Sequence, residues 1–113
     1  MNKIEIISNN QVSQYARLFD ETNPNWSKSP KQNKYFLEIV QNMVNDILRS
    51  RGQLFLNEVY DYLGFENSKE GDIVGWIWND GAGYIIFNID FINDHKQSIL
   101  LDFNVDGVIY DLI

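Results

Sequence analysis

The apolar residues of this 113-residue chain change their spacing between its two parts, and this change limits the folds that the chain can form. In the first part they recur every three or four positions, as on one side of a helix. From Asp72 onward they alternate with polar residues, as in a strand with one covered face. The change predicts a single α+β domain over 1–113, with N-terminal helices packed on one face of a mainly antiparallel sheet of about four strands.

The mainly helical part is expected over 1–71, and its clearest helix is predicted over residues 31–50. Ser29 can cap the start of this helix, and Pro30 suits its first position. An apolar stripe follows, made of Phe36, Ile39, Val40, Met43, Ile47 and Leu48. Two arginines near the end complement the helix dipole, and Gly52 is suited to the position after it.

Two other segments before Asp72 have weaker signals. Ile4, Ile6 and Ile7 predict a short strand, and Ser8-x-x-Gln11 resembles a capping box. The helix predicted after this box carries Val12, Tyr15, Ala16 and Phe19 at helical spacing, and it ends by Glu21. The stretch "LFLNEVYDYLG" predicts a helix closed by Gly64, although a strand through Leu54 to Tyr60 is the alternative because the run is rich in strand formers.

Residues 72–113 are predicted to form a β-meander. Its strands are expected at 72–78, 84–91, 99–105 and 108–113, with turns at 79–83 and 93–96 and a hairpin at Asp106-Gly107. The alternation places Asp90, Asp102 and Asn104 on the open face of the sheet, and Asp111 is a further candidate for that face.

The charge of the chain is concentrated in this second part. The net charge of the whole chain is −7, and from Asp72 onward seven acids face Lys96 alone, a net charge of −6. Such a surface repels phosphate and attracts basic protein surfaces, so we expect no direct nucleic-acid binding there. No apolar run approaches the roughly 18 residues of a membrane helix, and MNKIEIISNN lacks the apolar core of a signal peptide. A cytoplasmic location is therefore expected, and the lack of cysteine permits it.

No motif predicts catalysis, a cofactor or a metal. The chain has no G-x-S-x-G or phosphate loop, and His95 is its only histidine. Asp102-x-Asn104-x-Asp106-Gly107 resembles the start of a calcium loop, but Ile113 occupies the position where such a loop has glutamate. We therefore expect a protein that is not an enzyme and needs no metal.

Aromatic residues could anchor a protein partner. Trp76 and Trp78 share a strand face, which suits a binding hot spot if they are exposed. Core packing beneath the helices is the favoured alternative, because aromatic residues dominate small cores. The candidate partner-binding residues are Asp80, Asp90, Asp102, Asp106, Asp111, Trp76, Trp78 and Tyr84.

Three stretches carry a family resemblance: "RGQLFLNEVYDYLGF", "GDIVGWIWNDGAGYIIFNI" and "ILLDFNVDGVIYDLI". Together they resemble a family of small uncharacterised proteins encoded by phages and integrative mobile elements of Gram-positive bacteria. The resemblance covers roughly residues 35–113. It implies a mobile-element protein working inside a bacterial host, and it assigns no catalytic residue.

In that context the acidity favours a binding function. The leading hypothesis is a non-enzymatic inhibitor of a host defence nuclease, of anti-CRISPR type, whose carboxylates mimic nucleic acid in a basic channel. The expected partner is a Cas nuclease or another basic nucleic-acid-binding protein. The alternatives are a structural or assembly accessory of a phage or conjugative element, which could self-associate, and a toxin-neutralising immunity protein.

Overall fold

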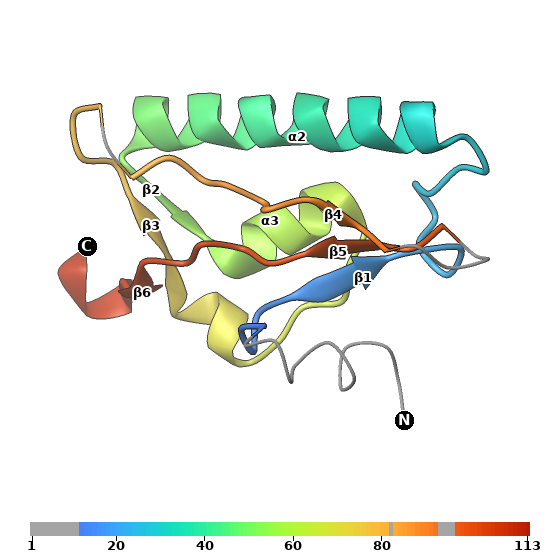
Figure 1. The fold of residues 1–113 in the computed structure, drawn as a ribbon. Coiled ribbons are helices and arrows are strands. Elements are labelled where there is room, and N and C mark those ends of the chain that lie inside the picture. Colours follow the sequence, from blue (N-terminus) through green and yellow to red (C-terminus); the bar gives the residue numbers. More distant parts are fainter. Residues whose placement is uncertain (1–11, 82, 93–96) are drawn as a thin grey trace.

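The computed structural model describes residues 12–81, 83–92 and 97–113, which form two α-helices and two antiparallel sheets of three short strands each (Figure 1). This arrangement confirms the α+β class with its helices in the N-terminal part. The predicted single sheet is instead divided in two. The strand expected at Ile4 to Ile7, the capping box at Ser8 and the turn that contains His95 lie outside the described residues.

The helix predicted over 31–50 is confirmed as α2, Pro30–Arg51, which runs along the length of the molecule above the strands (Figure 1). The Ser29 hydroxyl accepts a hydrogen bond from Gln32 N (3.2 Å), and Gly52 follows the helix with a left-handed φ of +94°. The buried side of α2 consists of Asn33, Leu37, Val40, Val44 and Leu48. Ile39 was expected in this stripe but is exposed, because it lies on the opposite side of the helix.

The strands come from both parts of the chain. In the first sheet the order is β1 (Arg17–Phe19), β5 (Ile99–Leu101) and β4 (Asp90–Phe91). In the second sheet the order is β2 (Gln53–Phe55), β3 (Val74–Ile77) and β6 (Gly107–Val108). Each sheet therefore includes one strand from the part that was predicted to be mainly helical.

The helix expected from Val12 to Glu21 is wrong. Residues 12–16 form no helix, and Arg17–Phe19 is β1, which pairs antiparallel with β5. Ala16 and Phe19 are buried, so the sequence pattern identified core residues correctly. Their spacing was interpreted as helical, although the segment forms a strand. Pairing with β5 supplies the hydrogen bonds that a helix would otherwise have supplied.

Both interpretations of "LFLNEVYDYLG" hold in part, because the stretch changes structure at Leu56. Gln53–Phe55 forms β2, and Leu56–Leu63 forms helix α3, closed by Gly64 at a φ of +91°. Glu58 accepts a hydrogen bond from Phe55 N (2.9 Å) and so satisfies one free donor at the helix start. The next strand approaches β2 closely at Gly75, where a Cβ atom would overlap Leu54 O.

The strand predicted over 84–91 is regular only at β4. Residues 84–88 are held by two backbone bonds, from Asp102 N to Phe87 O (2.9 Å) and from Asn104 N to Ile86 O (3.2 Å), and by side-chain amides from both sides. From α2, Asn45 exchanges two hydrogen bonds with the backbone of Ile85 (2.7 and 2.9 Å), and Gln41 accepts one from Phe87 N (2.9 Å). From the other side, Asn104 bonds the backbone on either side of Ile85, as described below. The amides satisfy backbone groups that a regular ladder would otherwise pair.

The hairpin predicted at Asp106-Gly107 is wrong, because the chain crosses there from the first sheet to the second. Gly107 adopts a φ of +139° and begins β6, which pairs antiparallel with β3. The closing strand predicted over 108–113 ends after Val108, and Tyr110–Leu112 forms a short 3-10 helix, η2. A second 3-10 turn, η1, spans Glu70–Asp72. The turn chemistry was recognised, but the pairing partner of the last strand was not.

One hydrophobic core lies between α2, α3 and the two sheets. Its largest fully buried side chains include Phe19, Tyr60, Trp76 and Phe87. The rings of Tyr60 and Phe87 each meet Phe103 edge to face, with centroid distances of 5.6 and 5.3 Å. Within the described ranges, no helix has both the length and the apolar character that crossing a membrane requires.

Candidate functional site

The aspartates predicted to bind a partner fall into two groups in the structure. Asp80, Asp90 and Asp111 are exposed, and they lie in the turn after β3, in β4 and in η2. Their carboxylates make no hydrogen bond or ion pair with any other described residue. These three charges are therefore available to a partner.

The other two aspartates bond the protein's own backbone. Asp106 is exposed, and one of its oxygens accepts a hydrogen bond from Ile77 N (3.1 Å). Asp102 is only partly exposed, and its Oδ2 accepts from Ser13 N (3.3 Å). Its Oδ1 is buried with no hydrogen-bond partner among the described residues. The expectation that Asp102 lies on an open sheet face is therefore wrong, because residues before β1 cover it.

Trp76 belongs to the core and cannot anchor a partner. Its side chain is 0% exposed, and its Nε1 donates to the backbone and side-chain oxygens of Asn104 (3.0 and 3.1 Å). Core packing, the favoured alternative for this residue, is what the structure has. The reason is that β3 is the central strand of its sheet and lies next to α3.

Trp78 and Tyr84 form a pair at the surface. Their rings meet edge to face with a centroid distance of 5.2 Å. Trp78 is half-buried against the core, and Tyr84 is exposed. The two rings come from opposite sides of the turn after β3, so this pair presents one aromatic ring to solvent and supports it with another.

Several exposed apolar residues near the acids were missed from the sequence. They are Ile73, Ile86, Phe91, Val108, Tyr110, Leu112 and Ile113. We call the exposed side chains of residues 72–81, 83–92 and 97–113 the C-terminal surface. The signal for Ile86 was present, since it alternates with the buried Ile85 and Phe87. The residues after Val108 gave no such signal, because η2 replaces the strand in which they were expected to alternate.

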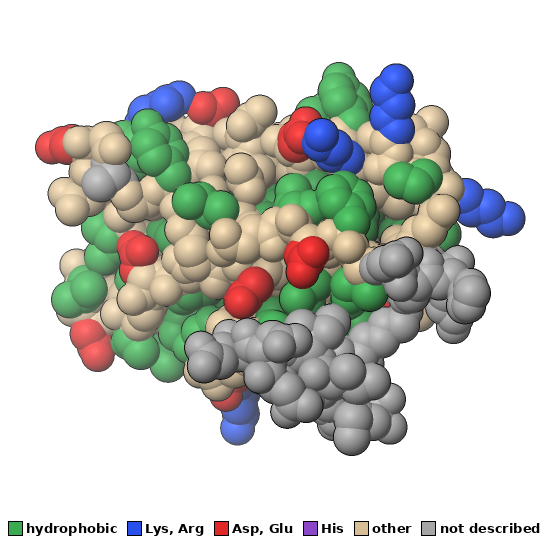
Figure 2. Space-filling view, in the orientation of Figure 1, with side chains coloured by type: hydrophobic (Ala, Val, Ile, Leu, Met, Phe, Trp, Pro, Cys, Tyr) green, Lys and Arg blue, Asp and Glu red, His purple; other side chains and the backbone are tan. Residues whose placement is uncertain are grey.

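The C-terminal surface is acidic as well as apolar. Its exposed residues include five aspartates, namely Asp72, Asp80, Asp90, Asp106 and Asp111, and no lysine or arginine. Figure 2 shows acidic side chains dispersed among hydrophobic ones over the strands, with the basic side chains over α2 and at the margins of this face. Acids and apolar groups are thus interleaved on a surface that has no basic group of its own.

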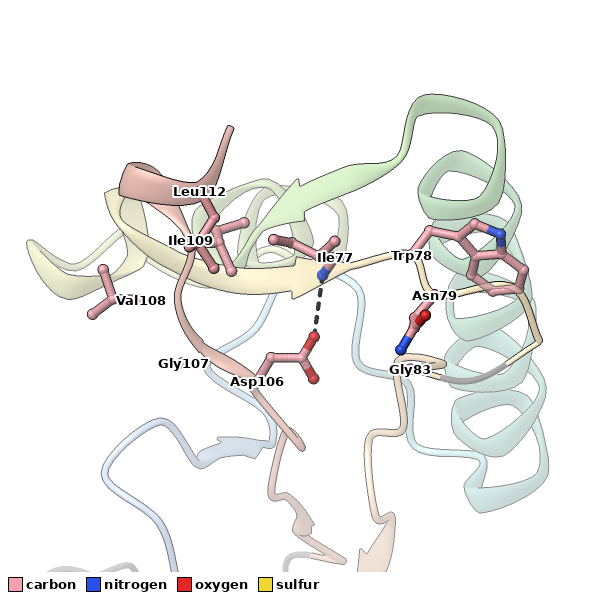
Figure 3. A pocket seen from close by; sticks show the side chains of 9 residues that line it. All are labelled: Ile77, Trp78, Asn79, Gly83, Asp106, Gly107, Val108, Ile109 and Leu112. Atoms are coloured by element: carbon pink, nitrogen blue, oxygen red, sulfur yellow. Dashed lines mark hydrogen bonds between the residues drawn. The ribbon is translucent and has the colours of Figure 1, made fainter.

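A pocket of about 450 Å³ opens into this surface beside β6. Ile77 lies over it, Asp106 and Gly107 form one side, and Asn79 and Gly83 lie across from them (Figure 3). The remaining lining residues are Trp78, Val108, Ile109 and Leu112. The lining thus combines apolar side chains with a single ionised group, the Asp106 carboxylate.

No group of three or more histidine, cysteine or acidic side chains is positioned to hold a metal ion within the described part of the chain. The residues of the calcium-like stretch serve the fold instead. Asp102 and Asp106 bond backbone amides on other segments, and Asn104 bonds Trp76, Tyr84 and Ile86. What the surface offers chemically is the exposed carboxylates of Asp80, Asp90 and Asp111, which can accept hydrogen bonds from cationic groups.

Comparison with known proteins gives a family and no function. No curated protein and no solved structure matches the chain significantly. A family of unknown function, DUF6353, matches the chain from residue 1 to residue 113. The match spans both sheets and both helices described above, so the protein belongs to the DUF6353 family.

Proposed function

We propose that this protein is a non-enzymatic acidic binding protein of a phage or other mobile element, and that it inhibits a host defence nuclease in the manner of an anti-CRISPR protein. The observation that carries the proposal is the C-terminal surface, where five exposed aspartates accompany exposed apolar side chains, with no lysine or arginine among them. Interfaces that combine charge complementarity with apolar anchors are typical of specific protein binding.

The proposed mechanism is competition with nucleic acid in the host cytoplasm. Asp80, Asp90 and Asp111 would pair with lysine and arginine side chains that line a nucleic-acid channel. Tyr84 and Phe91 would add buried apolar area at the contact. Because these carboxylates make no bonds within the described protein, they can bind a partner without loss of internal contacts.

The test is protection from a Cas nuclease. We expect the purified protein to inhibit DNA cleavage by at least one effector from a panel of purified Cas nucleases. We also expect its expression to restore plaque formation by a targeted phage. The variant D80N/D90N/D111N removes three exposed charges and keeps side-chain shape, so it should weaken inhibition at least about tenfold, because each charge-assisted contact contributes of the order of 1 kcal/mol or more.

The matched control is E38Q/D46N/D61N, which removes three exposed charges from the two helices. Both variants have the same net charge, so a difference between them locates the effect on the C-terminal surface. Equal weakening by both variants would indicate a general charge effect. Absence of inhibition across the whole panel would contradict the proposal.

A second candidate is an assembly accessory that self-associates through a sheet edge. The specific observation is that β4 and β6 are edge strands and expose Phe91 and Val108. Unpaired strand edges with apolar side chains are templates for pairing with another chain. Light scattering over a range of protein concentrations distinguishes the assembly accessory from the nuclease inhibitor, because only the accessory requires a defined oligomer. A Phe91→Lys substitution should cause that oligomer to dissociate into monomers.

A further inference from the structure

The pocket beside β6 has a lining suited to one kind of side chain. Ile77, Val108 and Leu112 contribute apolar surface, and Asp106 contributes the only charge. Its volume of about 450 Å³ falls within the range of roughly 300–1,000 Å³ that is common for ligand sites. An occupant therefore needs an apolar body and a single cationic group.

We propose that this pocket receives a lysine or arginine side chain of the protein partner, with its aliphatic stem against Ile77 and Leu112 and its cationic group on the Asp106 carboxylate. Both side chains have this division between an apolar stem and a charged end. A carboxylate binds either cation through a charge-assisted hydrogen bond. The inference rests on the proposed function, and it adds the chemistry of the residue that the partner contributes.

The fold holds the carboxylate in place before any partner binds. One oxygen of Asp106 accepts from Ile77 N, and Figure 3 shows the other oxygen without a bond to any residue drawn. Asp106 N also donates to Gly75 O (3.0 Å), which ties this residue to β3. A carboxylate fixed in this way loses little conformational entropy on binding.

The surroundings add to the selectivity for a cation. Asp80 follows the pocket residue Asn79, and Asp111 precedes the pocket residue Leu112. No lysine or arginine is present in the described residues from Asp72 onward, and no ion pair of Asp106 with a described residue is found. The acidic surroundings should draw basic segments toward the pocket and repel acidic ones.

The test uses NMR titration with small probes. N-acetyl-lysine methylamide and its arginine analogue should shift the backbone amide signals of Ile77, Gly83 and Val108. N-acetyl-norleucine methylamide has a similar stem without charge and should bind about tenfold more weakly, the difference expected for one charge-assisted contact. Equal binding of norleucine and lysine probes, or shifts centred on β4, would overturn the proposal.

Two variants test the carboxylate and the apolar surface of the pocket separately. Asp106→Asn keeps an acceptor for Ile77 N and removes the charge, so lysine should then bind no better than norleucine. Leu112→Ser changes an exposed side chain in η2 and should weaken all probes, including norleucine. The control Asp61→Asn, at an exposed residue of α3 that does not line the pocket, should leave probe binding unchanged.

The outcomes separate this inference from the proposed function. If D80N/D90N/D111N abolishes nuclease inhibition while the lysine probe fails to bind, the C-terminal surface functions without the pocket, and only the inference is wrong. If the lysine probe binds at Asp106 while no nuclease is inhibited, the inference about the pocket holds and the proposed function is wrong.

Discussion

Single side chains connect distant segments of this protein, and Tyr60 is the clearest example. Its ring is fully buried, its hydroxyl donates to Tyr15 O (2.7 Å), and the Arg17 guanidinium lies 4.8 Å from the ring centroid. Helix α3 is thereby joined to the segment that leads into β1. Burial raises the pKa of Tyr60 to about 12, and the positive charge of Arg17 limits that rise.

The raised pKa predicts a loss of stability in alkali. In the unfolded chain Tyr60 ionises near pH 10.0, whereas in the folded protein it keeps its proton until about pH 12. Its contribution is therefore complete below pH 10 and is lost as the pH rises through this interval. The loss should amount to roughly 2–3 kcal/mol of unfolding free energy. Urea unfolding at pH 8, 10 and 11.5 measures it.

The control is Tyr60→Phe, which has no proton to lose. This variant should be less stable at pH 8, because Tyr15 O loses its buried donor. Between pH 10 and 12 it should then lose less stability than the parent. The same fall in both proteins would mean that other groups cause the alkaline transition.

At the scale of elements, the segment 84–88 shows what periodicity can and cannot predict. Ile85 and Phe87 alternate with Tyr84 and Ile86, and the structure buries the first two and exposes the other two, but Phe91, which falls in the same alternation as Ile85, is exposed. Alternation did not predict that side-chain amides from α2 and from Asn104 would supply several of the backbone's hydrogen bonds in this segment, because such bonds join residues 18 to 46 positions apart. Local patterns give burial, whereas the pairing partner depends on the rest of the chain.

The difference between local signals and long-range pairing also explains why α2 was predicted correctly and the hairpin at Asp106-Gly107 was not. Ser29, Pro30 and Gly52 act on their immediate neighbours, so α2 was predictable almost to its ends. Asp106-Gly107 is also local turn chemistry, but whether the chain folds back or crosses to β3 depends on residues that lie 32 and 34 positions before their partners in β6. For the candidate site, the excess of acid and the favoured core position of Trp76 were visible in the sequence, but the partial burial of Asp102 was not.

Asn104 provides the test at this scale. Its Oδ1 accepts from Ile86 N (2.7 Å) and its Nδ2 donates to Tyr84 O (2.8 Å). Asn104→Ala removes both bonds, and with them the bond from Trp76 Nε1 to Asn104 Oδ1 (3.1 Å), and should lower the free energy of unfolding by about 2–4 kcal/mol. The control Asn42→Ala alters an exposed residue of α2 and should stay within about 0.5 kcal/mol of the parent. Urea unfolding of both variants measures these changes. If both variants have equally small effects, the Asn104 amide does not stabilise the segment 84–88.

At the scale of the whole molecule, the ion pairs lie on the helices, and Asp61, Glu66 and Glu70 have no ion-pair partner among the described residues. Within the described ranges, the ion pairs join residues of α2 and α3, as in Arg49 with Asp46 (2.6 Å) and Arg51 with Glu58 (2.6 Å). The acids of the C-terminal surface have no such partner in the described structure. Uncompensated like charges repel one another and do not stabilise the compact state. The variants D80N/D90N/D111N and E38Q/D46N/D61N therefore differ, because only the second removes ion-paired acids.

This difference predicts opposite stability effects for the two triple variants. D80N/D90N/D111N removes unpaired charges, so in low salt its free energy of unfolding should be unchanged or higher by up to about 1 kcal/mol. E38Q/D46N/D61N removes the partners of Lys34 and Arg49, so it should lose a few tenths of a kcal/mol, on the order of a surface pair. Both differences should shrink near 1 M salt, where the screening length falls to about 3 Å. Urea unfolding at two salt concentrations measures them. A fall of more than about 1 kcal/mol for D80N/D90N/D111N would mean that these aspartates stabilise the fold, and the acidity would then need no partner to explain it.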